Sequence, residues 1–360
     1  MNKIQSVINI VMTLMRQYWK YKNHDIGMKL AFLLVSGGIT LLISGISWRV
    51  LISIEIFDIP TSIDISPDNL YFYGVFSLVA GSIVGVYRLS FIQKQTTGIL
   101  IIHRGMEGMS TTAIQHALPK SFSKGKLEII DLHEGHQINE GKVISPGRAL
   151  EVVNGLDQQI KTRLNGRDIS EVKLAYGGLA PIPLLVTAGY RITSRQECLT
   201  LDYSRAGTWH GLDDIDDMEE ISIIAPNGEI KDDVAVILPF SVEISETQLP
   251  NSLSGKSYII HLENGARPDS LNSTDKQKRI ATEFYTLCAN MKAKHPDFNE
   301  IHLFLASQAS FAFRLGTMLT TSVMPKISVY QYDSATGKYD WGVTISAGNK
   351  PVIIGKSNII

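Results

Sequence analysis

Two apolar stretches near the N-terminus constrain this chain more than any other feature. The first, Leu30 to Ser47, reads LAFLLVSGGITLLISGIS, and the second, Leu70 to Val86, reads LYFYGVFSLVAGSIVGV. No charged residue interrupts either stretch, and each approaches the roughly 20 apolar residues that cross a bilayer core. We therefore predict two transmembrane helices within residues 29–92, at about 30–52 and about 70–90.

Charged residues beside these stretches predict their orientation. The flanks are basic and the connecting loop 58–69 is acidic; the residues concerned are Lys20, Lys22, Lys29, Arg88, Lys94 and Arg104 in the flanks and Asp58, Asp64 and Asp68 in the loop. Basic residues favour the cytoplasmic side, so both termini are expected there, with lipid as a partner. Residues 1–28 are expected to form an amphipathic helix, either on the inner leaflet or packed against the spans.

A stripe of small residues, Ser77, Gly81 and Gly85, recurs along the second stretch. Small residues at this spacing let two helices approach closely in lipid. The stripe can serve contacts between copies of the chain. It can equally pack within one chain, with Gly81 against a Ser36/Thr40/Ser44 stripe of the first stretch.

From residue 97 onward, short β-rich runs alternate with helical segments, which predicts parallel sheets covered by helices. The expected strands are Ile99–His103, Leu127–Leu132, Lys173–Tyr176, Cys198–Tyr203, Val234–Pro239, Ser257–Leu262, Ile301–Ala306 and Lys326–Tyr332. The expected helices are Thr111–Ala117, Ala149–Leu164, Pro181–Tyr190, Thr274–Lys294 and Ala309–Leu319.

The strand and helix series also looks like an internal repeat. VKLAYGGLAPIPLLVTAGYRI, from Val172, can be laid over EIHLFLASQASFAFRLGTML, from Glu300. The overlay places Gly189 on Gly316, a shift of 127 residues, and the same shift places Tyr203 on Tyr330. A period this long predicts two duplicated units, which we place at 97–230 and 231–360.

Ligands of open parallel sheets bind beyond the carboxyl ends of the strands, where helix N-termini attract anions. The turns at these positions are small, polar or basic: 103–105, 177–180, 240–241 and 307–310. Ser307 or Ser310 can instead simply cap the helix that follows. Beyond another strand end, Trp209 follows Arg205 in a glycine-containing loop and can stack on a base, and Arg314 can reach a phosphate or a neighbouring subunit.

The remaining residue patterns are better explained by structural roles than by nucleic-acid binding, metal binding or catalysis. With a formal net charge of −1, the chain has no overall positive electrostatic field that would attract long nucleic acid. His133 and His136 have the wrong spacing for a zinc helix, and the acidic run 213–220 lacks the pattern of a calcium loop. Cys198 and Cys288 suit core packing in a reduced compartment. We therefore expect no metal, no cofactor and no catalytic residue.

The stretch IHLFLASQASFAFRLGTMLTTSVMPKISVYQYD, from Ile301 to Asp333, resembles the signature of SAVED domains. LAYGGLAPIPLLVTAGY, from Leu174, looks like the matching element of that family's first half, and LDYSRAGTWHGLDD, from Leu201, also fits. The resemblance covers about residues 97–360. One departure is Gln308, where many members have proline, so the contacts of that helix start are expected to differ.

The resemblance implies a membrane-anchored α/β protein: two transmembrane helices followed by a SAVED domain of two tandem CARF-like (Rossmann-like) units. SAVED domains bind cyclic oligonucleotides, commonly cyclic trinucleotides, made by a cognate nucleotidyltransferase (CD-NTase) in bacterial CBASS anti-phage systems. Binding drives oligomerisation and switches on a fused effector. Here this implies disruption of the bacterial inner membrane and abortive infection, with the short loop in the periplasm and the SAVED domain in the cytoplasm.

Two alternatives to this non-enzymatic effector stay open. One is a membrane-tethered enzyme that degrades cyclic nucleotides, a ring nuclease or hydrolase. The other is a membrane-docked scaffold that recruits a partner. The residues expected to contact the cyclic oligonucleotide are His103, Arg104, Gly178, Arg205, Trp209, Ser241, Ser307, Gln308, Ser310 and Arg314.

Overall fold

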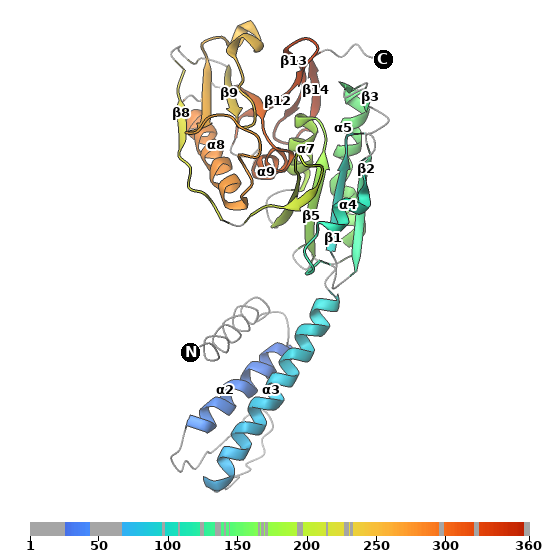
Figure 1. Cartoon of the computed structure of the whole chain (residues 1–360), viewed down its shortest axis with the longest axis vertical. Coiled ribbons are helices and arrows are strands. Elements are labelled where there is room, and N and C mark those ends of the chain that lie inside the picture. The colour runs from blue at the N-terminus through green and yellow to red at the C-terminus, as the bar shows by residue number, and fades with distance from the viewer. Residues whose placement is uncertain are drawn as a thin grey trace. The chain divides into compact units, whose positions relative to one another are not determined.

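The chain divides into two compact units in a computed structural model, Met1–Gln95 and Thr96–Ile360 (Figure 1). The structure describes residues 26–43, 67–95 and 98–355, except for short gaps at 107–108, 123–125, 134–137, 140–141, 144, 165, 167–168, 170–171, 193–196, 214, 227–229, 231–232, 295–298 and 320–323. The amphipathic helix predicted at 1–28 and the loop predicted at 58–69 lie mostly outside these residues.

Two helices, α2 (Ile26–Ile43) and α3 (Pro67–Gln95), pack side by side in the first unit (Figure 1). Their contact uses the small-residue stripe, because a Cβ added to Gly81 would lie 2.9 Å from the carbonyl oxygen of Ala31. Ser77 also donates from Oγ to the carbonyl of Leu34 at 2.8 Å. The stripe therefore packs within one chain, although Gly81 meets Ala31, Leu34 and Val35 rather than the expected serine and threonine stripe.

The prediction of two transmembrane helices is wrong for the part of the chain that the structure describes. No helix there has both the length and the apolar character needed to cross a membrane. α3 has 29 residues but begins with Pro67 and Asp68 and carries Arg88 and Lys94 toward its end.

The first sheet of the second unit has the order β2-β1-β5-β6-β7. Its four parallel strands are β1 (Gly98–Arg104), β2 (Leu127–His133), β5 (Lys173–Leu179) and β6 (Cys198–Tyr203), and β7 (Trp209–Gly211) runs antiparallel to β6. A separate two-stranded pair joins β3 (Ile138–Asn139) to β4 (Lys142–Val143).

The second sheet has the order β14-β13-β12-β11-β9-β10-β8. Its parallel centre holds β9 (Asp233–Pro239), β10 (Ser257–Leu262), β11 (Glu300–Ala306) and β12 (Lys326–Asp333). The antiparallel strands are β8 (Ile221–Ile224) at one edge and β13 (Lys338–Ile345) and β14 (Val352–Gly355) at the other. Both sheets are therefore mixed, which corrects the prediction of purely parallel sheets.

Helices and short turns complete this unit. They are α4 (Thr111–His116), α5 (Pro146–Asn154), α6 (Leu156–Leu164), α7 (Ile182–Ile192), α8 (Thr274–Lys294) and α9 (Ala309–Met318), with 3-10 turns η3 (Glu246–Gln248) and η4 (Asn251–Leu253). Figure 1 shows α7 and α9 between the two sheets, where α7 contacts β12 and α9 contacts β6.

A single apolar core joins the two halves. It includes Ile101 and Tyr176 from the first sheet, Val236 and Leu303 from the second, and Phe313 from α9. The rings of Tyr176 and Phe313 stack with their centroids 3.6 Å apart. β8 lies before residue 230 in the sequence and belongs to the second sheet.

The contact between α7 and α9 joins residues that the predicted repeat makes equivalent. A Cβ added to Gly189 would lie 2.0 Å from the carbonyl oxygen of Phe313, and one added to Gly316 would lie 2.0 Å from that of Val186. Val186 and Phe313 differ by 127 positions, as do the two glycines. The two helices therefore meet through equivalent residues, and only glycine leaves room for the two backbones.

Candidate functional site

The carboxyl ends of the two sheets meet at one edge. Gln308 follows β11 as the N-cap of α9, and its Nε2 donates to Oδ2 of Asp202 at 2.8 Å. Asp202 lies near the carboxyl end of β6 in the other sheet. Gln308 also donates to Oδ1 of Asn272 at 2.9 Å and accepts from the backbone N–H of Leu271 at 2.7 Å. One side chain therefore ties the two halves together where their strands end.

A matching contact joins the other two strand ends. Ile182, the first residue of α7 after β5, donates its backbone N–H to Oε1 of Gln331 at 2.8 Å. Gln331 lies near the end of β12. We call the surface at Ile182, Asp202, Gln308 and Gln331 the shared carboxyl edge. It is the place where a parallel-sheet protein of this kind binds ligands.

Strand pairing shows which aromatic residues are equivalent. Leu174 pairs with Cys198, and its repeat counterpart Ile301 pairs with Ile327, so the partner strands are shifted by 129 positions rather than 127. Tyr203 is therefore equivalent to Tyr332, and the predicted match with Tyr330 is wrong. The two extra residues between β11 and β12 explain the error, because the overlay assumed equal spacing.

The loops that follow the strands also pair within each half. Gly105 donates its N–H to the carbonyl of Leu179 at 2.8 Å, and Ser241 donates its N–H to the carbonyl of Ala306 at 2.8 Å. Leu179 and Ala306 again differ by 127 positions. A Cβ on Gly105 would lie 2.6 Å from Ala180, so this close approach requires glycine. Gly105, Leu179 and Ser241 thus lie in three of the four predicted turns, and Ala306 directly precedes the fourth, 307–310.

Two predicted ligand contacts in the first half lie inside the sheet. His103 is fully buried, and its Nδ1 lies 2.7 Å from the hydroxyl of Tyr176. Gly178 is buried beside it, because an added Cβ would lie 2.6 Å from the Cβ of His103. The pair positions the strand ends rather than presenting polar atoms at the surface.

Two predicted contacts in the second half join a buried polar network. Arg314, which is 9% exposed, donates from Nε to Oε1 of Gln277 at 2.9 Å and from a terminal nitrogen to Oγ1 of Thr200 at 2.7 Å. Ser310 is also buried, and its Oγ accepts from Nε2 of Gln277 at 2.9 Å. Arg314 therefore connects α9, α8 and β6 and does not face solvent as a phosphate contact would.

Three further predicted residues lie nearer the surface. Arg104 donates from Nε and a terminal nitrogen to both carboxylate oxygens of Asp131, at 2.8 and 2.6 Å. The hydrogen bonds to Asp131 raise the pKa of Arg104, and its charge is paired with Asp131 at the end of β1. Ser241 and Ser307 are half-buried beside the shared carboxyl edge, and the Oγ of Ser307 donates to the carbonyl of Gln308 at 3.1 Å.

The hairpin between β6 and β7 presents the most accessible predicted residues. Arg205 is exposed in the turn, which is closed by a hydrogen bond from the N–H of Ser204 to the carbonyl of Thr208 at 2.9 Å. Trp209 is half-buried, and its ring centroid lies 5.2 Å from that of Tyr203. An arginine next to an aromatic pair can bind a phosphate while a base stacks on one of the rings.

A second aromatic pair lies at the equivalent position of the other half. Tyr332 and Tyr339 have their ring centroids 5.4 Å apart and belong to neighbouring strands, as Tyr203 and Trp209 do. Tyr203 and Tyr332 are each 40% exposed. The sequence did not indicate Tyr339, because the antiparallel strand β13 was not predicted.

The family model for the SMODS-associated and fused to various effectors sensor domain, SAVED, matches residues 154–345. This range exceeds half of the 360 residues and contains all four residues of the shared carboxyl edge. The chain belongs to the SAVED family. The matched range begins after β1 and β2, so His103 and Arg104 lie outside the matched part of this SAVED protein.

Solved SAVED structures resemble part of the chain. The Acinetobacter baumannii Cap4 SAVED/CARF-domain containing receptor with the cyclic trinucleotide 3'3'3'-cAAA aligns at 13% identity with a TM-score of 0.47, covering 76% of this chain and 59% of that one. The Moraxella osloensis Cap4 receptor aligns at 12% identity with a TM-score of 0.45, covering 77% and 60%. This chain therefore spans about three fifths of their length. No curated protein matches it.

Asp202 sets the electrostatics of the edge in this SAVED domain. Its carboxylate is 3% exposed and accepts hydrogen bonds from Gln308 and from the backbone N–H of Tyr203. Burial raises the pKa of Asp202, although these hydrogen bonds oppose the rise. A buried negative charge therefore lies beside the N-terminus of α9, the position that would otherwise attract an anionic ligand.

The acidic run 213–220 is held against α8 by ion pairs. Lys276, which is 1% exposed, lies 2.7 Å from Asp217 and 2.6 Å from Glu219. Arg267 forms a second ion pair with Glu219 at 2.6 Å, and Arg279 one with Asp216 at 2.8 Å. A small polar cavity of about 170 Å³ lies beside these ion pairs. These basic side chains neutralise much of the negative charge of the run.

Proposed function

We propose that this SAVED protein is a sensor in anti-phage defence that binds a cyclic oligonucleotide at the shared carboxyl edge. The expected ligand is a cyclic trinucleotide made by a cognate nucleotidyltransferase. Binding drives head-to-tail assembly of copies of the chain and leaves the ligand intact, so the protein acts without chemistry of its own.

The observation that carries the proposal is the pair of matching contacts, Asp202 with Gln308 and Gln331 with Ile182. They bring the carboxyl ends of both sheets, and the N-termini of both central helices, to one edge. A cyclic oligonucleotide presents repeated phosphates and bases around a ring. An edge built from two repeated halves offers repeated contacts to such a ring.

Local charge and aromatic surface support the same ligand. The chain has a formal net charge of −1, so attraction for three phosphates must come from individual groups. Arg205 is exposed beyond β6, between Tyr203 and Trp209 in sequence. Stacking of a base on an aromatic side chain contributes about 1–3 kcal/mol, and the half-exposed Tyr203 and Tyr332 offer such surfaces in both halves.

The first ligand to test is 3'3'3'-cAAA, with linear tri-adenylate as the control. The full chain should bind the cyclic ligand in calorimetry, and light scattering should show larger particles when it is present. Arg205→Ala should weaken binding at least about tenfold, or about 1.4 kcal/mol. Lys161→Ala on α6, which also removes an exposed cation, should bind as the parent does.

Three results would contradict the proposal. Equal binding of cyclic and linear ligand would show that the ring is not recognised. Cleaved ligand in mass spectrometry would favour the enzymatic alternative. Unchanged affinity in Arg205→Ala, with normal folding, would move the ligand away from the hairpin between β6 and β7.

A further inference from the structure

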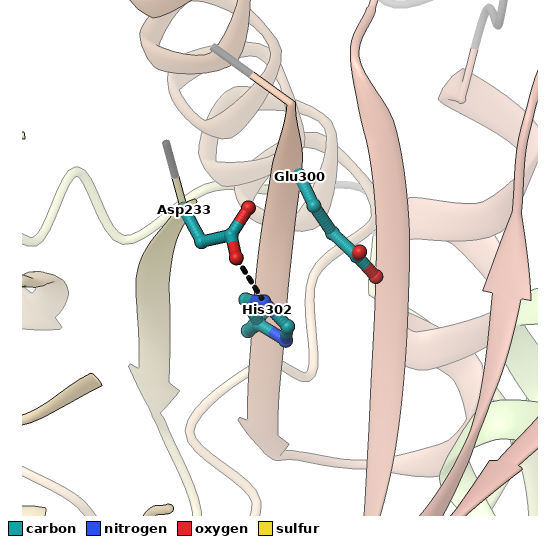
Figure 2. Close-up of side chains that lie close together, drawn as sticks. All are labelled: Asp233, Glu300 and His302. Atoms are coloured by element: carbon teal, nitrogen blue, oxygen red, sulfur yellow. Dashed lines mark ion pairs between the residues drawn. The ribbon is translucent and has the colours of Figure 1, made fainter. Parts of the chain in front are cut away.

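Three potential metal ligands gather at the opposite edge of the second sheet, where its strands begin. Asp233 is the first residue of β9, Glu300 the first of β11, and His302 lies two residues farther along β11. Figure 2 shows Asp233 and His302 facing one another across these neighbouring strands. This edge is separate from the shared carboxyl edge, so it is independent of the proposed function.

The spacing of the ligand atoms fits a small divalent ion. One ligand atom from each of the three residues lies within 4.8 Å of the others, and Nε2 of His302 lies 3.8 Å from Oδ2 of Asp233. Zinc bonds of about 2.0–2.2 Å to nitrogen and oxygen place tetrahedral ligands about 3.4 Å apart. Small side-chain rotations on two paired strands close this difference.

Neighbouring side chains hold His302 and Glu300 in place. Nδ1 of His302 lies 2.8 Å from the hydroxyl of Tyr330, which leaves Nε2 directed toward Asp233. Ser328 donates from Oγ to Oε1 of Glu300. Metal-bound histidines and carboxylates usually have such supporting hydrogen bonds.

Lys326 would compete with a metal ion for the carboxylate of Glu300. Its ammonium lies 2.5 Å from Oε2 of Glu300, so it balances part of the negative charge when no metal is bound. The side chain of Lys326 is 46% exposed, whereas that of Glu300 is 14% exposed. The lysine can therefore swing into solvent while the carboxylate stays on the rigid strand.

We propose that Asp233, Glu300 and His302 form a binding site for zinc or a similar first-row divalent ion, with water completing the coordination. The mixed set of one imidazole and two carboxylates suits such ions better than calcium, which prefers oxygen ligands throughout. The bound ion would join the first residues of β9 and β11 and would displace Lys326 from Glu300.

The test uses the full chain, stripped of metal with a chelator and titrated with zinc. Elemental analysis of the dialysed protein should give about one zinc per chain, and cobalt in place of zinc should give visible absorption typical of a low-coordinate site. His302→Gln should weaken binding by at least about tenfold. His261→Gln, a change of a histidine on the neighbouring strand β10, is the matched control and should bind as the parent does.

Lys326→Met gives a result that no folding defect can mimic. Removing the competing cation should tighten zinc binding and enlarge the rise in melting temperature that zinc produces. The proposal fails if the parent takes up no zinc at about 0.1 mM, or if His302→Gln binds zinc as tightly as the parent. It also fails if a His133→Ala/His136→Ala variant, rather than His302→Gln, abolishes binding.

Discussion

Asp202 is the residue whose chemistry bears most directly on the proposed ligand binding. Its buried carboxylate accepts a hydrogen bond from Gln308 at the start of α9. Burial raises its pKa, so the group takes up a proton at a higher pH than an exposed aspartate does. Lowering the pH therefore neutralises Asp202 before it neutralises exposed aspartates.

The affinity for 3'3'3'-cAAA should rise as the pH is lowered from neutral toward the ordinary aspartate pKa of about 3.9. Protonation of Asp202 removes a negative charge that repels the phosphates of the ligand. Asp202→Asn should bind more tightly than the parent at the upper pH and should lose most of the pH dependence. Calorimetry at several pH values measures both effects.

Asp157→Asn on α6 is the control, since it removes an exposed carboxylate away from the edge. It should keep the pH dependence of the parent. An Asp202→Asn variant with the parent's pH profile would show that another group sets the charge at this edge.

Glu219 is the residue whose charge matters most for stability. It is 8% exposed and pairs with Arg267 and Lys276, and these partners hold its pKa well below the usual range. A carboxylate with a lowered folded-state pKa stabilises the protein above its unfolded-state pKa of about 4.3, and this stabilisation is lost as the pH falls through that range toward the folded-state pKa.

Glu219→Gln should lower the free energy of unfolding at pH 7 by about 3 kcal/mol, because it leaves a buried cation without one of its partners. The loss should shrink below about pH 4, where the parent also begins to lose the charge. Urea unfolding at both pH values measures the difference. Glu263→Gln, at an exposed position, should stay within about 0.5 kcal/mol of the parent.

At the scale of elements, the crossing of α7 and α9 holds the two halves together. The backbones meet at Gly189 and Gly316, and the flanking side chains of both helices belong to the common core. A side chain at either glycine would push carbonyl groups apart and disturb both sheets. The shared carboxyl edge depends on this crossing, because α7 and α9 begin at that edge.

Gly189→Ala and Gly316→Ala should each destabilise the protein by about 3 kcal/mol or more, since the added Cβ would lie 2.0 Å from a backbone oxygen. Gly147→Ala is the matched control in α5, where nothing lies within 4 Å of the added Cβ. It should be neutral or stabilising by up to about 1 kcal/mol. Equal effects of all three changes in urea unfolding would show that the crossing is not tightly packed.

Most elements of the second unit were predictable because each has a local signal. The predicted bounds of Cys198–Tyr203, Ser257–Leu262 and Thr274–Lys294 agree with β6, β10 and α8. The predicted helix Ala149–Leu164 is instead two helices that meet at Gly155, the C-cap of α5. β13 was missed although Gly337, with φ of 68°, marks the turn before it.

The site was less predictable because its partners are distant in sequence. The turn 307–310 was correctly placed at a strand end, but Asp202 lies 106 positions from Gln308 and Thr200 lies 114 from Arg314. No local pattern indicates that Arg314 is buried or that a carboxylate occupies the start of α9. Asp233, Glu300 and His302 likewise come together only through the order of the strands in the sheet.

At the scale of the whole molecule, the question is what ligand binding does to the helical unit. α2 and α3 expose large apolar side chains, among them Leu33 at 67%, Phe76 at 65% and Ile83 at 64%. Exposed apolar surface of this kind favours association with another surface. Assembly of the SAVED domains would raise the local concentration of the helical units carried by the same chains.

A cysteine at Ser82 should therefore cross-link between chains when 3'3'3'-cAAA is added. Ser82 is exposed on α3 beside Ile83. The background should be low, because burial raises the pKa of Cys198 to about 12 and also raises that of the buried Cys288. Gel electrophoresis after treatment with a short bismaleimide measures the cross-linked fraction.

The same variant carrying Arg205→Ala should need at least about tenfold more ligand. Cross-linking that is equal with and without ligand would mean that the helical units associate independently of sensing. Growth of the particles without any cross-linking would mean that assembly joins the SAVED domains and leaves the helical units apart.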